Sequence, residues 1–208
     1  VYTPTEISAL SRVAKGNGLS VHMDGARFAN AVASQQVTPA ELSWKAGVDV
    51  LCLGATKCGA LCAEVVIFFN KELAKTFTHR RKRGGHLLSK GRVFGAQMVG
   101  WLQDDHWLEL ANQANTQAAK LAETINGIDG LQLVWPVESN ELFVVVPKDM
   151  ANYLRDAGAE FYDWYVDTLP PNVTLKDDQQ FLRLVTSFAT QDSHRQQFCE
   201  SIRSYFIT

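Results

Sequence analysis

Apolar positions in the first third of the chain form short continuous runs, separated from one another by segments with helical spacing. Strands are expected at 19–25 (LSVHMDG), 48–55 (VDVLCLGA) and 64–70 (EVVIFFN), where apolar residues follow one another without polar alternation. Such strands are typical of a mostly parallel α/β sheet that is covered on both faces. His22, inside the first of them, is therefore expected to be a packed core histidine.

Helices are expected around and between these strands. The segment 3–18 has apolar residues at helical spacing after a cap at Thr3 or Thr5, and glycines stop it. Further helices are expected at 26–34 and 38–47. The alternation of strand and helix predicts a domain of the α/β class.

The second half of the chain has a different character. A long helical stretch at 89–128, broken near 103–106, is expected to link two lobes. From about Leu131 onward, short strands and helices without a uniform repeat predict a small α+β domain. We therefore divide the chain into a partial large domain at 1–105 and a linking helix with a small C-terminal domain at 106–208. Strands are expected at 131–136, 140–147 and 181–188, helices at 149–158 and 192–207, and a hairpin-like region at 161–166.

Composition and charge exclude several classes of function. The formal net charge of −2 gives no general attraction to nucleic acid or to an anionic membrane. No apolar run approaches the ~20 residues that a membrane helix needs, and no signal segment starts the chain, so we expect a cytoplasmic protein. The basic run at 78–86 (THRRKRGGH) lacks interleaved aromatic residues and is expected to be a solvated or subunit-facing loop.

The cysteines and paired acids do not indicate a metal site. The spacing of Cys52, Cys58 and Cys62 does not match the close pairs of a zinc site, and no disulfide framework is evident. We expect these cysteines to be reduced, small and mostly buried. Asp104 and Asp105 are interpreted as part of a helix junction, so no metal is expected.

Two of the expected strands end in residues that could carry chemistry. One ends in Asp24 with Arg27 shortly after it, and the next ends near Lys57 among small residues. If the two strands are parallel neighbours, the three side chains emerge at the same edge of the sheet, where α/β sheets bind ligands. An acid, a guanidinium and a Schiff-base-forming lysine suit an anionic, electron-poor ring such as pyridoxal phosphate (PLP). Taken singly, each has a plainer interpretation, as a turn carboxylate, a surface arginine and a solvated lysine.

The segments that contain these residues resemble one family. VHMDGARFANA (21–31) followed by GVDVLCLGATKCGALCAEVVIFF (47–69) is similar to the core of the threonine aldolases, within the fold type I PLP-dependent enzymes. That family has a strand ending in D-G-A-R and a later strand ending in T-K-x-G. The segment 80–98 resembles the low-specificity and phenylserine-type aldolases, and FLRLVTSF (181–188) resembles the family's C-terminal R-x-V-T element. The resemblance covers essentially the whole chain in order.

The resemblance implies roles in binding the cofactor for four residues. Lys57 would be the catalytic residue that holds PLP as a Schiff base. Asp24 would pair with the nitrogen of the pyridine ring, and Arg27 would lie near the ring hydroxyl. Thr56 would contact the phosphate or the ring hydroxyl.

The resemblance also implies residues that bind the substrate. Arg183 would bind the substrate carboxylate, because a planar guanidinium can form two parallel hydrogen bonds with it. Lys90 and Arg92 match a segment that, in the family, approaches the active site of its own or of a neighbouring subunit. The alternative for these two is a solvated basic loop.

An activity and an assembly are implied by the same resemblance. The expected enzyme is a PLP-dependent aldehyde-lyase that cleaves L-threonine or a related small β-hydroxy-α-amino acid to glycine and an aldehyde, and works as a homodimer or homotetramer. The family's chains are longer, with a phosphate-binding part upstream, so 1–105 is expected to be an incomplete PLP-binding large domain. Two alternatives stay open: a truncated, non-catalytic fragment that self-associates through an exposed sheet edge, and a related PLP-dependent lyase or aminotransferase.

Overall fold

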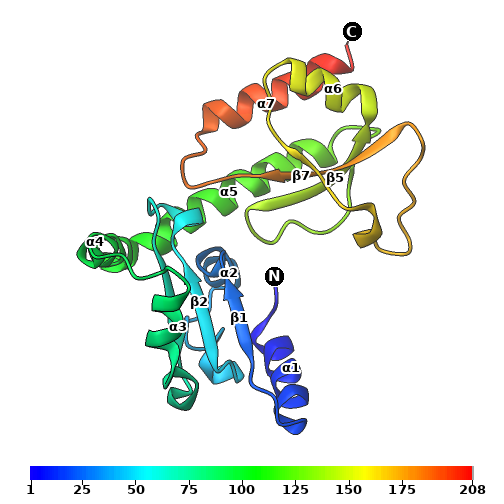
Figure 1. Ribbon diagram of the computed structural model, residues 1–208. Helices are drawn as coiled ribbons and strands as arrows, with labels where there is room; N and C mark the ends of the chain where they lie inside the picture. The colour runs from blue at the N-terminus through cyan, green and yellow to red at the C-terminus, as the bar shows by residue number, and fades with distance from the viewer. Residues whose placement is uncertain (208) are drawn as a thin grey trace. The chain divides into compact units, whose positions relative to one another are not determined.

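The chain forms two compact units, Val1–Asn112 and Gln113–Thr208, and the computed structural model describes residues 1–207 (Figure 1). The boundary falls within one helix, α5 (His106–Asn126). Each unit has its own sheet and its own cluster of buried apolar side chains.

The sheet of the first unit has three strands in the order β1-β2-β3. β1 (His22–Gly25) and β2 (Val50–Gly54) are parallel, whereas β3 (Glu64–Phe68) runs antiparallel to β2. The connection from β2 to β3 contains no α-helix, and a parallel return would need a longer crossover. The expected α/β class is confirmed, with a mixed sheet in this unit.

Most helices of the first unit follow the sequence pattern, but most of the basic run at 78–86, which was expected to be a loop, forms the helix α3 (Phe77–Arg83). The helices are α1 (Pro4–Gly16), α2 (Phe28–Gln35), α3, α4 (Gly91–Leu102) and the first part of α5. Short 3₁₀ turns occur at Trp44–Ala46, Thr56–Cys58, Lys71–Ala74 and Gln103–Asp105. The last of these turns is the predicted break in the long helical stretch, and Asp104 adopts a φ of 53° there.

α1 begins with a reciprocal cap. The backbone N–H of Glu6 donates to the hydroxyl of Thr3 at 3.2 Å, and the N–H of Thr3 donates to the carboxylate of Glu6 at 2.8 Å. These two bonds satisfy backbone amides that have no partner inside the helix. The hydrogen bonds that Thr3 donates to the carboxylate of Glu6 also lower the pKa of Glu6. Of the two predicted caps, Thr3 is therefore the one that forms.

The helix expected at 38–47 does not form. Thr38 and Glu41 make a reciprocal cap like that of α1, with bonds of 3.3 and 2.8 Å. Only the 3₁₀ turn Trp44–Ala46 follows, and Gly47 then leaves helical geometry with a φ of 99°. Too few residues lie between the cap and Gly47 to offset the cost of nucleating an α-helix.

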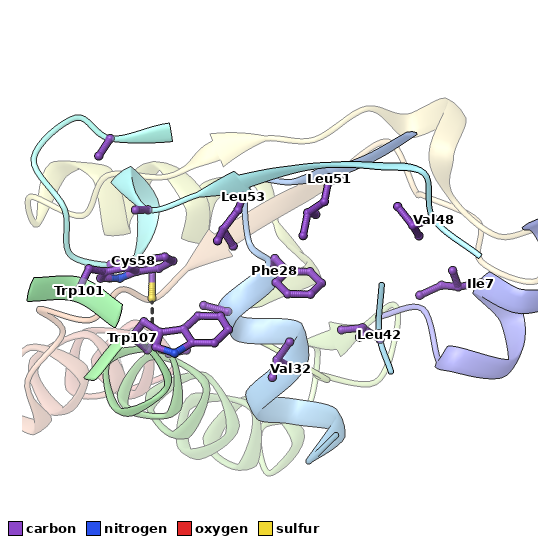
Figure 2. Close-up of a cluster of buried hydrophobic side chains, with 14 of the residues drawn as sticks. Ile7, Phe28, Val32, Leu42, Val48, Leu51, Leu53, Cys58, Trp101 and Trp107 are labelled. Carbon is purple, nitrogen blue, oxygen red and sulfur yellow. Dashed lines mark hydrogen bonds between the residues drawn. The ribbon is translucent and has the colours of Figure 1, made fainter. Parts of the chain in front are cut away.

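The core of the first unit lies between α2 and one face of the sheet. Phe28 of α2 lies next to Leu51 and Leu53 of β2, and Val32 of the same helix belongs to the same buried cluster (Figure 2). The ring of Phe28 also stacks on Trp107 at the start of α5, with ring centroids 6.5 Å apart. Further members of this core are Ile7, Ala29, Leu42, Ala46, Val48, Ala55, Cys58, Ala63, Trp101 and Ala111.

The other face of the sheet is open along β1. Exposure alternates along this strand, so that His22 and Asp24 are exposed while Gly25 is buried. His22 is therefore not a core histidine, and that expectation is wrong. Its Nε2 atom lies 3.2 Å from the sulfur of Cys52 on the neighbouring strand. The sequence of β1 is largely apolar, but only one face of the strand packs against α2, and His22 lies on the other face.

The second unit is a four-stranded antiparallel sheet with helices, as the sequence predicts for a small α+β domain. Its strand order is β4-β5-β7-β6, and all three pairs are antiparallel. The strands are β4 (Gln132–Leu133), β5 (Glu141–Pro147), β6 (Tyr162–Asp163) and β7 (Gln179–Val185). The helices are the remainder of α5, α6 (Lys148–Asp156) and α7 (Asp192–Tyr205), and a 3₁₀ turn spans Val166–Thr168.

The core of the second unit joins its helices to β5 and β7. Its largest fully buried side chains include Ile125 of α5, Leu142 of β5 and Leu182 of β7. Met150 and Leu154 of α6 and Cys199 and Ile202 of α7 belong to the same cluster.

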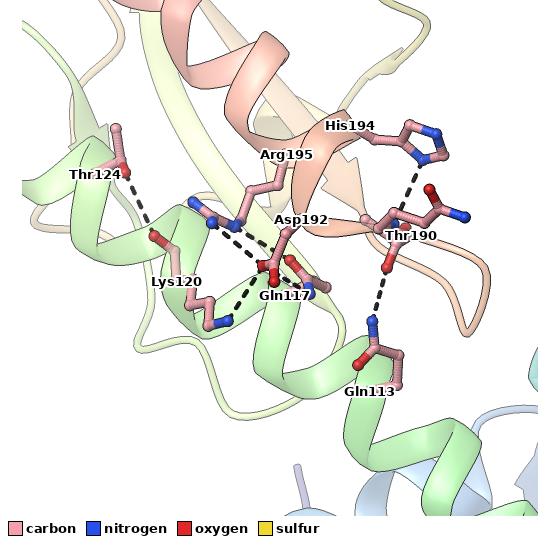
Figure 3. Close-up of polar contacts among 9 residues, drawn as sticks. Gln113, Gln117, Lys120, Thr124, Thr190, Asp192, His194 and Arg195 are labelled. Atoms are coloured by element: carbon pink, nitrogen blue, oxygen red, sulfur yellow. Dashed lines mark hydrogen bonds and ion pairs between the residues drawn. The ribbon is translucent and has the colours of Figure 1, made fainter.

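Polar contacts fasten the start of α7 to α5 (Figure 3). The carboxylate of Asp192 accepts hydrogen bonds from Lys120 and Gln117, each at 3.2 Å. Arg195 donates to the same carboxylate at 3.3 Å and to the amide oxygen of Gln117 at 3.1 Å. These donors, Lys120 foremost, lower the pKa of Asp192.

The remaining general expectations concern the cysteines and the membrane. All four cysteines are free thiols, as predicted; Cys58 and Cys199 are buried, Cys52 is half-buried and Cys62 is exposed. Within residues 1–207, the helices are all too short or too polar to cross a lipid bilayer.

Candidate functional site at the edge of the first sheet

Asp24 and Lys57 lie at the same edge of the sheet in the first unit. The parallel register places Gly25 opposite Leu53, so β1 and β2 end together. Asp24 is the penultimate residue of β1, and Lys57 lies in the 3₁₀ turn that follows β2. The carboxyl ends of parallel strands are where α/β folds place their ligands, so these two residues define a candidate site.

The carboxylate of Asp24 is exposed and takes part in the local turn. One of its oxygens accepts a hydrogen bond from the backbone N–H of Ala26 at 3.0 Å, which is the turn role that its plainer interpretation describes. Arg27 follows as a half-buried residue directly before α2. Asp24 also acts electrostatically on its neighbour in the sheet: after burial, it is the largest cause that raises the pKa of Cys52.

Lys57 presents its amine to solvent. Its side chain and that of Thr56 are both exposed. No carboxylate among the described residues forms an ion pair with Lys57, so its amine is available to a ligand.

Glycines at the ends of β1 and β2 allow the backbone to pack closely near Lys57. A Cβ atom at Gly54 would lie 2.8 Å from the Cα of Ala26, which is closer than real structures allow. A Cβ atom at Gly25 would meet the carbonyl oxygen of Cys52 at 2.6 Å. Glycine is therefore required at both positions if the strands are to approach this closely.

The turn that carries Lys57 is fixed by its own backbone and by α4 and α5. The carbonyl of Ala55 accepts hydrogen bonds from the N–H groups of Cys58 and Ala60, at 3.0 and 3.1 Å. The indole N–H of Trp101 donates to the carbonyl of Cys58 at 2.7 Å. The thiol of Cys58 donates to the carbonyl of Trp107 at 3.5 Å, as the dashed line in Figure 2 shows.

The thiol of Cys58 remains protonated at neutral pH. Burial raises its pKa to about 11, and Cys58 is only 2% exposed. A thiol adjoining Lys57 is therefore a structural hydrogen-bond donor and not a nucleophile at this site.

Arg183 lies in the second unit, on β7, beside aromatic residues. Its guanidinium carbon lies 4.4 Å from the ring centre of Trp164 and 5.7 Å from that of Tyr162, and its Nη1 donates to Glu141 at 3.4 Å. The register explains this arrangement, because Arg183 is paired directly with Tyr162 on β6. The stack orients the plane of the guanidinium.

A hollow of about 480 Å³ opens beside Arg183. Its lining includes Arg155, Phe161 and Tyr162 in addition to Arg183. The Nε atom of Arg183 is buried and has no hydrogen-bond partner among the described residues. The hollow thus offers an oriented guanidinium to a small anion.

Lys90 and Arg92 lie at the start of α4. Both are exposed, as are all residues from 78 to 93, which include the basic run. No hydrogen bond or ion pair of the described residues connects either side chain to Asp24 or Lys57. The structure therefore does not bring Lys90 and Arg92 together with the sheet edge.

Several residues that shape these sites were not identified from the sequence. Trp101 and Trp107 flank the helix junction at Asp104 and Asp105, and both contact Cys58. Trp164, in the hairpin-like region expected at 161–166, stacks on Arg183. The paired aromatic residues Tyr162 and Trp164, two positions apart, were an available signal, since alternate residues of a strand share a face.

The fold of the chain matches that of the fold type I class of PLP-dependent enzymes. The profile of the beta-eliminating lyase family matches residues 1–149. The chain therefore belongs to the beta-eliminating lyase family.

Individual relatives narrow the similarity to threonine aldolases. The chain is 49% identical over 162 residues to the low specificity L-threonine aldolase of Pseudomonas aeruginosa, a match that covers 78% of this chain and 47% of that protein. It is 46% identical over 162 residues to the protein of the same name from a Pseudomonas species, with the same two coverages. The chain spans about half the length of these curated relatives.

A solved structure agrees with the sequence comparisons. The threonine aldolase of Leishmania major superposes with a TM-score of 0.86 at 30% identity, over 98% of this chain and 57% of that chain. The resemblance to threonine aldolases that the sequence motifs indicated is thereby confirmed.

Proposed function

We propose that the protein of this chain is a PLP-dependent aldolase that cleaves L-threonine or related β-hydroxy-α-amino acids to glycine and an aldehyde. The observation that carries the proposal is the parallel register of β1 and β2, which brings Asp24 and Lys57 to one edge of a sheet. The similarity to low-specificity L-threonine aldolases supports the choice of reaction.

The residues at the edge fit PLP in shape and chemistry. Gly54, Ala55 and Gly59, on either side of the turn that carries Lys57, have little or no side chain, which would leave room beside the amine for a planar ring. An exposed amine and an exposed carboxylate lie at the same edge, and within residues 1–207 the amine forms no ion pair. When bound, the cofactor supplies an electron sink for the bond that is broken.

Each residue of the edge has a distinct proposed task. Lys57 is the covalent attachment point for the aldehyde carbon of PLP. Asp24 keeps a proton on the ring nitrogen through its carboxylate, because a negative charge beside that nitrogen stabilises the protonated form. Arg27 and Thr56 would donate hydrogen bonds to oxygen atoms of the cofactor.

The substrate is proposed to be held by its carboxylate. Arg183 suits this task because its guanidinium is planar and is oriented by Trp164 and Tyr162. Lys90 and Arg92 remain proposed substrate contacts, as the resemblance implies.

The assay that tests the proposal distinguishes three reactions of this cofactor class. Purified protein with PLP is given L-threonine or phenylserine, and the products are quantified. Equal amounts of glycine and aldehyde are expected. Release of ammonia together with a 2-oxo acid would instead indicate β-elimination. Release of a 2-oxo acid without free ammonia would indicate transamination. Either result without glycine would contradict the aldolase proposal.

A matched pair of lysine variants connects the activity to the site. Lys57→Ala is expected to lose glycine release entirely, because no other residue of the edge can attach the cofactor. Lys71→Ala removes an exposed lysine that belongs to the same unit but lies away from the edge. This variant is expected to release glycine as the wild-type protein does. Equal activity of the two variants would contradict the role of Lys57.

Self-association is the second candidate property, and a homodimer or homotetramer is proposed for the enzyme. β1 is an edge strand of its sheet, and apolar side chains are exposed near it on α1 and its flanks. These are Tyr2, Leu10, Val13 and Leu19, each more than half exposed. If this chain alone is a non-catalytic fragment, it is expected to sediment as an oligomer and to release no glycine; a catalytically active monomer would exclude that alternative.

A further inference from the structure

The residue after Lys57 is fixed through each of its hydrogen-bonding groups. The N–H of Cys58 donates to Ala55, its carbonyl accepts from Trp101 and its thiol donates to Trp107. Cys58 and Trp101 are both buried, at 2% and 4% exposure. The two peptide groups that flank Cys58 are thus held in place, one of which joins it to Lys57.

The loop beyond Cys58 is fixed from the same helix. Gln97 lies one turn before Trp101 on α4, and its side-chain oxygen accepts a hydrogen bond from the N–H of Cys62 at 3.0 Å. The side chain of Leu110 packs directly on Gly59, where a Cβ atom would lie 2.5 Å from its Cδ1. α4 and α5 therefore hold both ends of the segment that follows Lys57.

We propose that Trp101 is a positioning residue for Lys57, acting through the hydrogen bond from its indole to the carbonyl of Cys58. This inference rests on the proposed function of Lys57 as the attachment point of PLP. The amine of Lys57 is exposed and has no partner of its own among residues 1–207, so the direction of its side chain depends on the backbone of the turn. A covalent attachment needs the amine within about half an ångström of its productive position.

The helix break between α4 and α5 makes this contact possible. Asp104 and Asp105 adopt positive φ values, of 53° and 57°, and interrupt the helix there. Trp101 and Trp107 consequently face each other across the break, with ring centroids 5.4 Å apart. One ring presents its N–H to the Lys57 turn, and the other residue presents its backbone carbonyl.

The test compares Trp101→Phe with Trp107→Phe. The first variant removes the N–H that binds Cys58 and keeps an aromatic ring. The second reduces a neighbouring buried ring in the same way but keeps the backbone carbonyl that Cys58 uses. Any general cost of a smaller ring in this core is therefore shared by both.

The first measurement is amide hydrogen exchange of the peptide that contains residues 58–62. In Trp101→Phe, exchange at Cys58 and Ala60 is expected to accelerate about tenfold, which corresponds to the loss of one hydrogen bond. The amides of β2 should be unaffected, and Trp107→Phe should leave the turn protected. An equal acceleration throughout the first unit would overturn the inference, because it would show a purely structural role.

The second measurement is the rate at which PLP becomes fixed to Lys57, followed by borohydride reduction and peptide mass analysis. We expect the rate to fall about tenfold in Trp101→Phe and to be unchanged in Trp107→Phe. Equal rates in the two variants would overturn the inference and leave the proposed function intact. No attachment to Lys57 in the wild-type protein would instead overturn the proposed function, and this inference with it.

Discussion

Cys58 and Cys62 are four residues apart and differ in how far their thiols are buried. Cys58 is buried, donates to a carbonyl and has a pKa of about 11, whereas Cys62 is exposed. The thiolate is the reactive form, and a pKa of 11 leaves about one Cys58 thiol in a thousand ionised at pH 8. The difference therefore follows from position within a single loop.

Alkylation with iodoacetamide at pH 8 tests this difference. Cys62 is expected to react within minutes, as an ordinary exposed thiol does, while Cys58 stays unmodified in the folded protein. Because the pKa of Cys58 is raised and not lowered, its residual reactivity should increase with each pH unit up to about 11. Peptide mass analysis identifies which cysteine is alkylated. The control is Cys62→Ser, in which the exposed thiol is absent. Equal reaction of Cys58 and Cys62 at pH 8 would contradict the burial of Cys58.

At the same scale, the sequence identified Lys57 and Asp24 but not what holds them. The sequence shows a lysine after one apolar run and an acid at the end of another, because the end of a strand is a local feature of the sequence. The bond from Trp101 to Cys58 joins residues more than forty positions apart. It depends on how α4 packs, which no local pattern encodes.

α1 is the element whose start is best specified by local chemistry. Thr3 and Glu6 cap it reciprocally, and Pro4 occupies its first turn. Two backbone amides that would otherwise lack partners are satisfied by these side chains. The helix was accordingly predicted from the sequence.

Replacement of the cap tests this account of α1. Thr3→Ala is expected to lower the free energy of unfolding by about 1 kcal/mol, as the loss of other N-caps does. Thr5 lies inside the first turn and does not cap the helix. Thr5→Ala is therefore expected to change the free energy of unfolding by less than about 0.5 kcal/mol. Urea unfolding followed by circular dichroism measures both. The capping role would be excluded if the two variants were equally stable.

Two elements show where element-scale prediction fails. The apolar letters of β3 suit either strand direction, so only the short connection after β2 indicates the antiparallel return. The segment 38–47 contains a complete cap signal, yet Gly47 stops the helix before it can propagate. Caps and apolar runs predict that an element starts, whereas direction and length depend on connections and on packing.

At the scale of the whole molecule, two units contain the two parts of the proposed chemistry. Asp24 and Lys57 belong to the first unit, and the oriented guanidinium of Arg183 belongs to the second. The α/β and α+β classes of these units were predictable, because the spacing of strands and helices differs between the two halves. The division falls within α5, where the pattern of the sequence is continuous.

The central claim is that the sheet edge of the first unit is a covalent PLP site. Its most direct test is to incubate the purified protein with PLP, reduce it with borohydride and locate the added mass among its peptides. The account predicts one principal modification, at Lys57, although Lys71 and other lysines are also exposed to solvent. Absence of modification at Lys57, or a similar extent of modification at Lys57 and Lys71, would contradict it.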